Sequence, residues 1–540
     1  MAEAHSGLRI WGGFVVPVER HESSVSFVLP LDQGRFEGEI SPDGRIIQGH
    51  WVQPTKVVAG YPFSTAVQLN ELVGQRAWFG TVLPLHDRLT LYLVVRASPD
   101  GSTMAFIRSP ESNFGAHRLF RIEGHGTEVR LVNINQEDDE IRGSYDLGTD
   151  RLFLSIPKNI NGARCPVAFD FARKTRDNAI GFYPRTPAAT HFDYRPPVSK
   201  PDGWTTGSLQ DVGLAIKPIA VAMDKLLSET TEDSSAPYIQ SVLVARHGKL
   251  VFEEYFYGFD AERPHDLRSI GKSFTSALVG IALDRRAGFN LRTPVLSLFP
   301  EYKSFANSDS RKNRVLVQNL LTMTSWLACN DGDDKSPGNE LNMFEQSAEP
   351  DFYKFILDLP MVQDPARQPM IYCSGGINLL GGIIRNTTGK RLIDFFDTYL
   401  ARPLGMSNYH LNLTPRGDMY GGGGLYMRPR DALKLGQLYL DEGVWNGHRI
   451  VSKVWVDQSV QRRSGYSAEH GYGFAWHLFQ LKVGSKTYDE FEAQGNGGQV
   501  INVIPRLDLV VMFTTGNYGD DETVPERKVL SAIIDSATRR

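Results

Sequence analysis

The sequence predicts two domains of different fold class, an all-β domain over residues 1–183 and a mixed domain over residues 205–540. Three observations predict this division. Apolar side chains alternate with period two through the first third of the chain, and a proline-rich segment follows. Beyond that segment, strand patterns stand at both ends of a long helical stretch, so one sheet must take strands from both ends of the domain. We therefore expect an antiparallel sheet with flanking helices and a separate helical lobe.

The N-terminal pattern is that of short strands separated by turns. Leu89 to Val95 alternates as a half-buried strand does, and Pro99 to Gly101 turns the chain. The pattern recurs in Met104 to Arg108, Glu140 to Tyr145 and Arg151 to Ile156. Short strands separated by turns predict a lipocalin-like barrel or a sandwich. No nucleophile, base and orienting group cluster here, which favours a scaffold, lid or binding role.

A linker over residues 184–204 separates the two domains. The segment from Tyr183 to Gly203 is rich in proline and lacks apolar periodicity. After it, Asp211 to Leu227 has helical spacing, and Ser241 to Ala245 with Leu250 to Tyr257 form a predicted hairpin. Helical patterns dominate the chain that follows. The C-terminal end returns to predicted strands and a last helix: Tyr472 to Leu478, Thr487 to Ala493, Gln499 to Ile504 and Leu509 to Thr515, then Val524 to Ala537.

Charge and composition exclude several classes of partner. The 58 Lys and Arg residues against 62 Asp and Glu residues give a net charge of −4, and the sequence pI is about 6.4. This balance lacks the basic surface that nucleic acids or anionic membranes require. No apolar run approaches the roughly 18 to 20 residues that span a bilayer. The start, MAEAHSGLRIWGG, lacks the pattern of an export signal, so we expect a cytosolic protein.

The three cysteines, Cys165, Cys329 and Cys373, show no CxxC or Cys/His spacing. They predict neither a disulfide framework nor a zinc site, so we expect buried thiols. The acidic run at residues 331–334 lacks the later glutamate of a calcium-binding loop, which favours a solvated loop. The thirteen histidines show no ligand spacing. We therefore expect no metal and no organic cofactor.

Ser269 and Lys272 form the strongest catalytic signal. Ile270, Phe274 and Ala277 recur at helical spacing, so Ser269 lies in the first turn of a helix and shares a face with Lys272. Unpaired backbone N–H groups and the helix dipole favour a developing negative charge at that position. A serine hydroxyl is a poor nucleophile until a base takes its proton, and a desolvated lysine can be that base. The pair predicts nucleophilic catalysis by Ser269.

The serine–lysine spacing alone is weak evidence, because Ser155 and Lys158 match it too. That copy lies in a strand pattern with a proline inside, so it cannot present a helical face. For Ser269 the alternative is a helix N-cap beside a solvated lysine. The GKS run at 271–273 is half of a phosphate-binding loop, but Asp266 stands where the first glycine is needed. No GxSxG or HExxH occurs, which removes the usual α/β-hydrolase and metalloprotease signatures.

The stretch from Val251 to Gly288, VFEEYFYGFDAERPHDLRSIGKSFTSALVGIALDRRAG, resembles the first-motif region of the class C β-lactamase-related serine hydrolases. This family includes carboxylesterases and 6-aminohexanoate-dimer hydrolase-like enzymes. Tyr372-Cys373-Ser374 resembles its Tyr-x-Asn or Tyr-x-Ser motif, and Leu320 to Met343 and Tyr420 to Gly447 are also similar. The resemblance covers most of Asp211 to Arg540 and leaves the β-rich domain outside. It implies a β-lactamase/transpeptidase-like fold and an acyl-enzyme.

The resemblance implies roles for the second motif. In the family the tyrosine faces the serine and lysine across the cleft, so Tyr372 would share protons with Lys272 and protonate the leaving group. The alternative is a core tyrosine whose hydroxyl is satisfied locally. Ser374 is the further polar residue of this motif, and the resemblance implies that it also lies at the site.

The third motif departs from the family. The family usually carries Lys-Thr-Gly or His-Thr-Gly, whereas the matching region from Ala493 to Gln499 reads AQGNGGQ, without a cation. An N–H group from Gly495-Asn496-Gly497-Gly498 would form an oxyanion hole with that of Ser269. A β-turn between two strands is the alternative, and both can hold. Loss of the cation that assists carboxylate recognition favours an uncharged acyl group.

Together these patterns predict a serine hydrolase that acts through an acyl-enzyme on a small neutral ester or amide. A β-lactamase, a D-Ala-D-Ala peptidase or an acyltransferase of the same family would use the same serine. An inactive descendant would use the site only to bind a ligand. The sequence does not set the oligomeric state or the role of the first domain.

Overall fold

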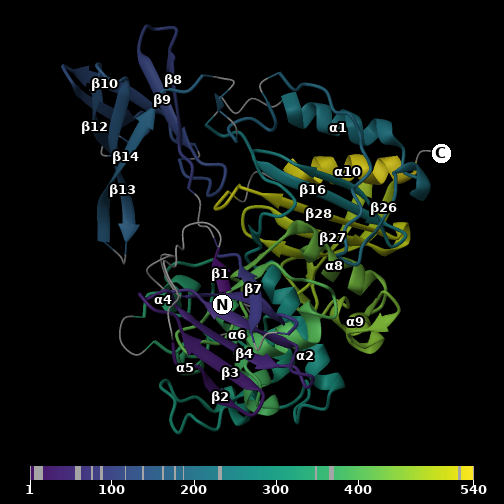
Figure 1. Ribbon diagram of the computed structural model, residues 1–540. Coiled ribbons are helices and arrows are strands. Elements are labelled where there is room, and N and C mark those ends of the chain that lie inside the picture. The colour runs from purple at the N-terminus through teal and green to yellow at the C-terminus, as the bar shows by residue number, and fades with distance from the viewer. Residues whose placement is uncertain are drawn as a thin grey trace.

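The computed structural model describes residues 2–4, 16–54, 62–74, 77–85, 89–115, 117–136, 139–160, 163–175, 178–179, 181–186, 188–228, 234–346, 350–363, 370–520 and 525–538. Within residues 157–165 it describes the backbone alone. Figure 1 shows two N-terminal sheets beside a C-terminal sheet that has helices on both faces. The prediction of an all-β N-terminal region followed by a mixed α/β and helical region is confirmed.

The first N-terminal sheet is continuous with strands from much later in the chain. Its neighbours follow the order β18-β20-β19-β6-β5-β4-β3-β2, and β7 pairs with β6 and with β1. Phe36, Trp51 and Val67 pack in the core on one face. The ten strands are β1 (Ala2–Ala4), β2 (Glu19–His21), β3 (Ser24–Val28), β4 (Arg35–Ile40), β5 (Ile46–Val52), β6 (Phe63–Glu71), β7 (Trp78–Val82), β18 (His265–Asp266), β19 (Tyr409–Asn412) and β20 (Leu425–Met427).

The second N-terminal sheet is an antiparallel meander in which each strand pairs with the next along the chain. Period-two alternation places Ala105, Ile107, Leu131, Ile141 and Leu154 together in its core. The strands are β8 (Tyr92–Ala97), β9 (Thr103–Arg108), β10 (Phe120–His125), β11 (Glu128–Asn133), β12 (Glu140–Asp146), β13 (Arg151–Ile160) and β14 (Ala163–Ala172). Ser155 and Lys158 lie in β13, as the strand pattern predicts.

The C-terminal sheet takes strands from both ends of its region, as predicted, in the order β15-β17-β16-β28-β27-β26-β25-β24-β23. Strand β16 of the hairpin therefore lies between β17 and β28, the latter from the end of the chain. The strands are β15 (Thr205–Thr206), β16 (Ile239–Arg246), β17 (Lys249–Tyr255), β23 (Ser464–Gly465), β24 (Gly471–Tyr472), β25 (His477–Val483), β26 (Lys486–Gly495), β27 (Gln499–Ile504) and β28 (Leu509–Thr515). A two-stranded pair, β21 (Val444–Trp445) and β22 (His448–Arg449), lies outside this sheet.

Helices cover both faces of the C-terminal sheet. The helices α1 (Ile216–Ser228) and α10 (Pro525–Thr538) lie side by side on one face in Figure 1. On the other face lie α2 (Ile270–Asp284) and α8 (Pro429–Leu440), and α2 is almost completely buried. The remaining helical segments are η2 (Gln210–Val212), η3 (Val295–Leu298), η4 (Ser310–Arg314), α3 (Val317–Leu321), α4 (Glu340–Phe344), α5 (Phe352–Asp358), α6 (Ser374–Thr388), α7 (Leu392–Phe396), η5 (Asp397–Ala401), α9 (Lys453–Ser459) and η6 (Pro505–Leu507).

The predicted strand from Tyr472 to Leu478 is wrong in extent, and the one predicted from Leu89 begins only at Tyr92. The pattern from Tyr472 to Leu478 predicts a single strand, but the chain leaves β24 after Tyr472 and re-enters the sheet at His477. A Cβ at Gly473 would lie 2.0 Å from the Ser459 carbonyl oxygen, and Ala475 has φ +58. The backbone therefore turns against α9 at a place where the apolar pattern continues without a break.

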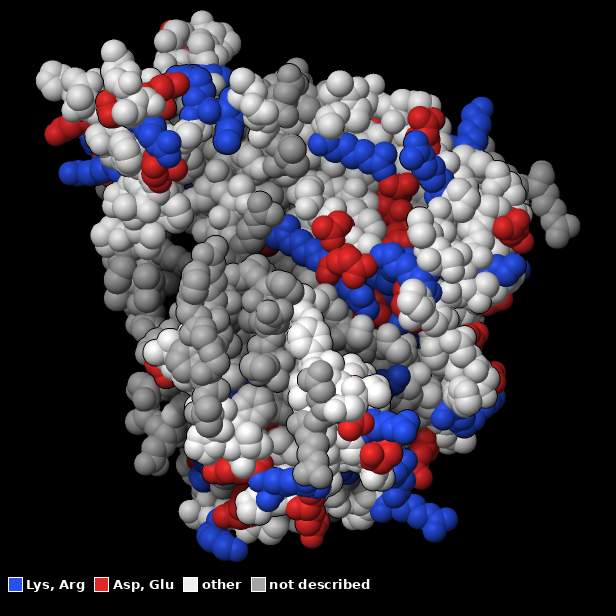
Figure 2. Space-filling view, in the orientation of Figure 1, with Lys and Arg blue, Asp and Glu red and all other residues white. Residues whose placement is uncertain are grey.

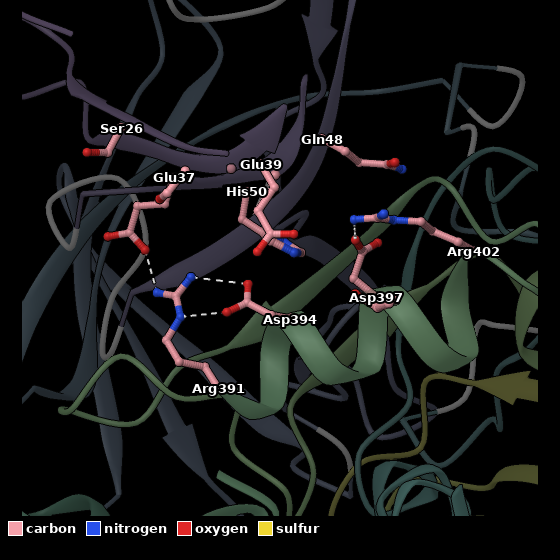
Figure 3. Close-up of a pocket in the computed structure, with 13 residues that line it drawn as sticks. Ser26, Glu37, Glu39, Gln48, His50, Arg391, Asp394, Asp397 and Arg402 are labelled. Carbon is pink, nitrogen blue, oxygen red and sulfur yellow. Dashed lines mark hydrogen bonds and ion pairs between the residues drawn. The ribbon is translucent and has the colours of Figure 1, made fainter. Parts of the chain in front are cut away.

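Ionic side chains join the first N-terminal sheet to the helical region. The polar face of β3, β4 and β5 lies over α7 and η5 and borders a cavity of about 340 Å³ (Figure 3). Arg391 binds Glu37 of β4 and, at 2.9 Å, Asp394 of its own helix. Arg402 likewise binds Asp397. This junction therefore relies on ion pairs around a polar cavity, whereas the opposite face of the sheet is apolar.

The second N-terminal sheet meets the C-terminal sheet through the loop after β9. Arg108 is buried and donates to the carbonyl oxygens of Ser234 at 2.6 Å and Ala236 at 2.8 Å. The Asn113 side chain donates to the Tyr518 carbonyl at 3.0 Å. Because a buried guanidinium needs its hydrogen bonds, Arg108 fixes the end of β9 against the segment before β16, and Asn113 joins the following loop to the segment after β28.

The surface carries mixed charge. On the face shown in Figure 2, Lys and Arg side chains lie among Asp and Glu side chains. Within the described part of the chain, no helix combines the length and the apolar character that crossing a bilayer requires.

Candidate active site

Ser269 lies at the start of α2, immediately after a turn from β18. The preceding residue, Arg268, has φ +49, a left-handed conformation that costs a non-glycine residue roughly 1 to 3 kcal/mol. Its guanidinium pairs with Asp266 at 2.8 Å and lies 4.9 Å from the Tyr518 ring centre. This turn directs Ser269 to the N-terminal end of a buried helix, where backbone N–H groups have no intrahelical acceptor.

Lys272 is within hydrogen-bond distance of the predicted nucleophile. Its Nζ lies 2.7 Å from Ser269 Oγ and donates to the Gly422 carbonyl at 2.6 Å. Only 1% of Lys272 is exposed, so water does not surround the amine. One helical turn separates the two residues, which is why the sequence spacing is sufficient to bring them together.

Tyr372 presents its ring to the same lysine. The Lys272 Nζ lies 4.9 Å from the Tyr372 ring centre, a cation–π distance. Within the described ranges, no hydrogen bond joins the Tyr372 hydroxyl to Ser269 or Lys272. The structure thus brings the tyrosine to the predicted neighbourhood with its ring face toward the amine.

A short loop holds Tyr372 and Ser374 from the side of the helical lobe. The Asp331 N–H donates to the Tyr372 carbonyl at 3.0 Å, and the Asp331 carboxylate accepts from the Ser374 N–H at 2.7 Å. Ser374 is buried as the first residue of α6. The acidic loop therefore includes one residue, Asp331, that accepts from the first N–H group of the helix following Tyr372.

The expectation of three buried thiols is wrong for two of the cysteines. Cys329 and Cys373 form a disulfide, 44 residues apart in sequence. Their spacing gives no motif, and only the folded chain places the Asp331 loop against the start of α6. Cys165 lies in β14, and its side chain is outside the described residues. The disulfide stands directly after Tyr372 and adds a covalent link at the same place as the Asp331 hydrogen bonds.

Glu340 and Tyr420 form a buried pair that sequence reasoning missed. The Tyr420 hydroxyl donates to the Glu340 carboxylate. Burial raises the pKa of Glu340 above its ordinary value, while the positive charge of Lys272 opposes the shift. Burial and the Glu340 carboxylate raise the pKa of Tyr420 well above its ordinary value. Because Tyr420 precedes Gly422, which accepts from Lys272, the pair supports the backbone that holds the amine.

The predicted third motif lies against the turn that carries Ser269. A Cβ at Gly495 would meet the Leu267 carbonyl oxygen at 2.2 Å, so only glycine allows this approach. Gly497 and Gly498 have positive φ and form the turn between β26 and β27. The Asn496 side chain accepts from the Gly519 N–H at 3.0 Å. Gly495 is therefore beside the nucleophile turn, while Asn496 is bound to the segment after β28.

The described residues contain no group of three or more His, Cys, Asp or Glu side chains arranged to hold a metal ion. The chemistry available at Ser269 is that of a hydroxyl, a buried amine, a tyrosine ring and the backbone N–H groups of a helix start. Such a set can activate a serine for attack on a carbonyl carbon.

Comparison with known proteins relates the C-terminal region of the chain to a family. A family model described as Beta-lactamase matches residues 224–533. The 6-aminohexanoate-dimer hydrolase of Paenarthrobacter ureafaciens is 27% identical over 333 residues, which cover 59% of this chain and 80% of that protein. Among solved structures, EstCE1, a hydrolase with promiscuous acyltransferase activity, has a TM-score of 0.49 at 15% identity and covers 62% of this chain and 100% of its own. A D-stereospecific amidohydrolase from Streptomyces sp. has a TM-score of 0.43 at 15% identity, with 54% and 92% covered.

Proposed function

Because the chain belongs to the beta-lactamase family, we propose that it is a serine hydrolase that forms an acyl-enzyme on a small neutral ester or amide. The observation that carries the proposal is the 2.7 Å contact between Lys272 Nζ and Ser269 Oγ, made by a buried amine at a helix start. A relative named as a dimer hydrolase supports hydrolysis as the reaction.

In the proposed reaction Lys272 takes the proton of the Ser269 hydroxyl as the oxygen attacks the carbonyl carbon. The tetrahedral oxyanion forms beside the Ser269 N–H and the end of β26 at Gly495, where backbone N–H groups can bind it. The proton passes to the leaving oxygen or nitrogen with Tyr372 as the donor. Water then attacks the acyl-enzyme with the same groups acting in reverse, releasing the acid.

The neutral substrate follows from the charges near the third motif. The AQGNGGQ segment carries no cation, and the nearby Arg268 is paired with Asp266. A substrate carboxylate would therefore meet no unpaired cation from these two elements. An uncharged acyl group needs no such cation.

The test is hydrolysis of short-chain p-nitrophenyl esters beside a chromogenic cephalosporin. We expect ester turnover by the wild-type protein, little cephalosporin cleavage, and loss of turnover in Ser269→Ala and in Lys272→Met. Intact mass should show an acyl adduct in the wild type and none in Ser269→Ala. Turnover that survives in Ser269→Ala would overturn the proposal, and fast cephalosporin cleavage would overturn the argument for a neutral substrate.

A further inference from the structure

Five aromatic rings form a continuous row that begins at Tyr372. The ring centres of Tyr372 and Tyr466 lie 6.5 Å apart, and those of Tyr466 and His470 lie 4.4 Å apart. Tyr466 and His477 are parallel to within 5° at 6.1 Å, and His470 contacts Phe479 at 4.2 Å. We call these five residues the aromatic row. It runs from the lysine of the site along the β23 to β25 end of the C-terminal sheet.

The row is uncharged at neutral pH although two of its members are histidines. Burial lowers the pKa of His470 to about 4 and that of His477 well below its ordinary value. The two rings are joined by a 2.8 Å hydrogen bond between His470 Nε2 and His477 Nδ1. The row therefore presents neutral aromatic surface beside the buried amine.

Tyr466 is the exposed member of the row. Half of it, 51%, is open to solvent, whereas His477 behind it is buried. Its N–H donates to the His470 carbonyl at 2.9 Å, which fixes the turn between β23 and β24. The Tyr466 ring packs on His470 and His477, so it is ordered before any ligand binds. Less conformational entropy is therefore lost when a ligand ring stacks on it.

Tyr466 is a neighbour of the tyrosine that acts on the leaving group. The Tyr372 ring centre lies 4.9 Å from Lys272 Nζ and 6.5 Å from the Tyr466 ring centre, and in the proposed reaction Tyr372 protonates the leaving group. We propose that the aromatic row is a subsite in which Tyr466 stacks on a planar aromatic ring of the leaving group. The substrates are then neutral esters or amides of arylmethyl alcohols or amines. This inference rests on the proposed hydrolase activity and adds the class of leaving group.

Two pairs of esters test the subsite. Benzyl acetate and cyclohexylmethyl acetate share the acyl group and a primary alcohol, and only the first has a planar ring. Ethyl phenylacetate and ethyl cyclohexylacetate place the same two rings on the acyl side. The variants are Tyr466→Ala, Tyr466→Phe and, as a matched control in the N-terminal sheet, Phe79→Ala at another half-exposed ring.

We expect the wild type to prefer benzyl acetate over cyclohexylmethyl acetate, and Tyr466→Ala to reduce that preference about three- to tenfold, the scale of one aromatic pair. The loss should be in KM, because stacking does not touch the reacting atoms. Tyr466→Phe and Phe79→Ala should keep the preference, and the acyl-side pair should not respond to any variant. Thermal melting checks that each variant is folded.

An equal loss for both acetates in Tyr466→Ala, or a change confined to the acyl-side pair, would overturn the subsite while leaving the hydrolase proposal intact. Absence of turnover with every ester in the wild type, and of an acyl adduct by mass, would instead overturn the hydrolase proposal itself. The two failures are therefore distinct.

Discussion

The Asp331 N–H donates to the Tyr372 carbonyl at 3.0 Å, and this contact is one of several that Asp331 makes near the site. Its carboxylate also accepts from the Ser374 N–H at 2.7 Å and the Glu340 N–H at 3.1 Å. The Asp331 carboxylate therefore binds the first N–H group of both α4 and α6, and the Asp331 N–H holds the carbonyl of the tyrosine whose ring faces Lys272. A residue from the acidic loop thus positions the site without contact with the reacting atoms.

Replacing Asp331 tests this positioning role. We expect Asp331→Ala to lower kcat more than it changes KM, because the start of α6, directly after Tyr372, loses its carboxylate acceptor while the substrate surface remains. Loss of an acceptor for two N–H groups at helix starts should also lower the free energy of unfolding by roughly 1 to 3 kcal/mol. Asp331→Asn keeps one acceptor and should recover part of both effects. The exposed Asp333→Ala is the control, and equal effects in the two alanine variants would contradict the role.

The Cys329–Cys373 disulfide predicts how many free thiols the unreduced protein contains. Denatured, unreduced protein should titrate one thiol, and reduced protein should titrate three. For a separation of 44 residues, loop closure in the unfolded chain accounts for about 4 kcal/mol of stability, so Cys329→Ser should melt well below the wild type. Cys165→Ser should change neither the disulfide nor its mass signature. Three thiols in unreduced protein would show that the disulfide does not form.

Tyr420→Phe should be destabilising because it leaves the buried Glu340 carboxylate without its hydroxyl donor. We expect a loss of about 1 to 3 kcal/mol in denaturant unfolding. Tyr238→Phe is the matched control, since the Tyr238 hydroxyl is buried and has no hydrogen-bond partner among the described residues. If Tyr238→Phe lowered the free energy of unfolding as much as Tyr420→Phe, removal of a buried hydroxyl in general, and not the contact with Glu340, would explain the effect.

The raised pKa of Glu526 predicts that the stability of the protein depends on pH. Burial raises its pKa from 4.5 to about 7, so the folded protein binds more protons than the unfolded chain between these values. Stability should therefore fall as pH rises from about 4.5 to 7, by up to about 3 kcal/mol from this group. Glu526→Gln should remove that slope and be the more stable protein at pH 8. The exposed Glu128→Gln is the control, and an unchanged slope in Glu526→Gln would contradict the assignment.

The sequence pattern predicted the elements that depend on neighbouring residues, and it missed the contacts between residues far apart in the chain. The bounds of β27 and β28 match the predicted residues, because each is a fully buried strand, rich in apolar side chains, between turns. Ser269 and Lys272 share one helix, so a three-residue spacing was enough to pair them. Glu340 and Tyr420 are 80 residues apart and meet only in the fold. Nothing in either neighbourhood marks them, since a single glutamate and a single tyrosine are ordinary in any helix or loop.

The aromatic row could be predicted only in part. Tyr466 and His470 lie in a turn, and His477 and Phe479 follow on β25. Period two on β25 places His477 and Phe479 on one face, which the sequence could have indicated. Their approach to Tyr372 depends on how the helical lobe meets the sheet, and no spacing along the chain encodes that contact.

The pairing of β6 with β19 makes the N-terminal region a structural partner of the hydrolase region. His410 faces Thr65 across it, with a 2.8 Å hydrogen bond between their side chains. A fragment that began after the linker would leave β19 as an edge strand, with free N–H and C=O groups and no neighbouring strand on that side. Such an edge is a template for pairing between molecules. In the intact chain β6 covers this edge, so the β19 backbone groups have their partners within one molecule.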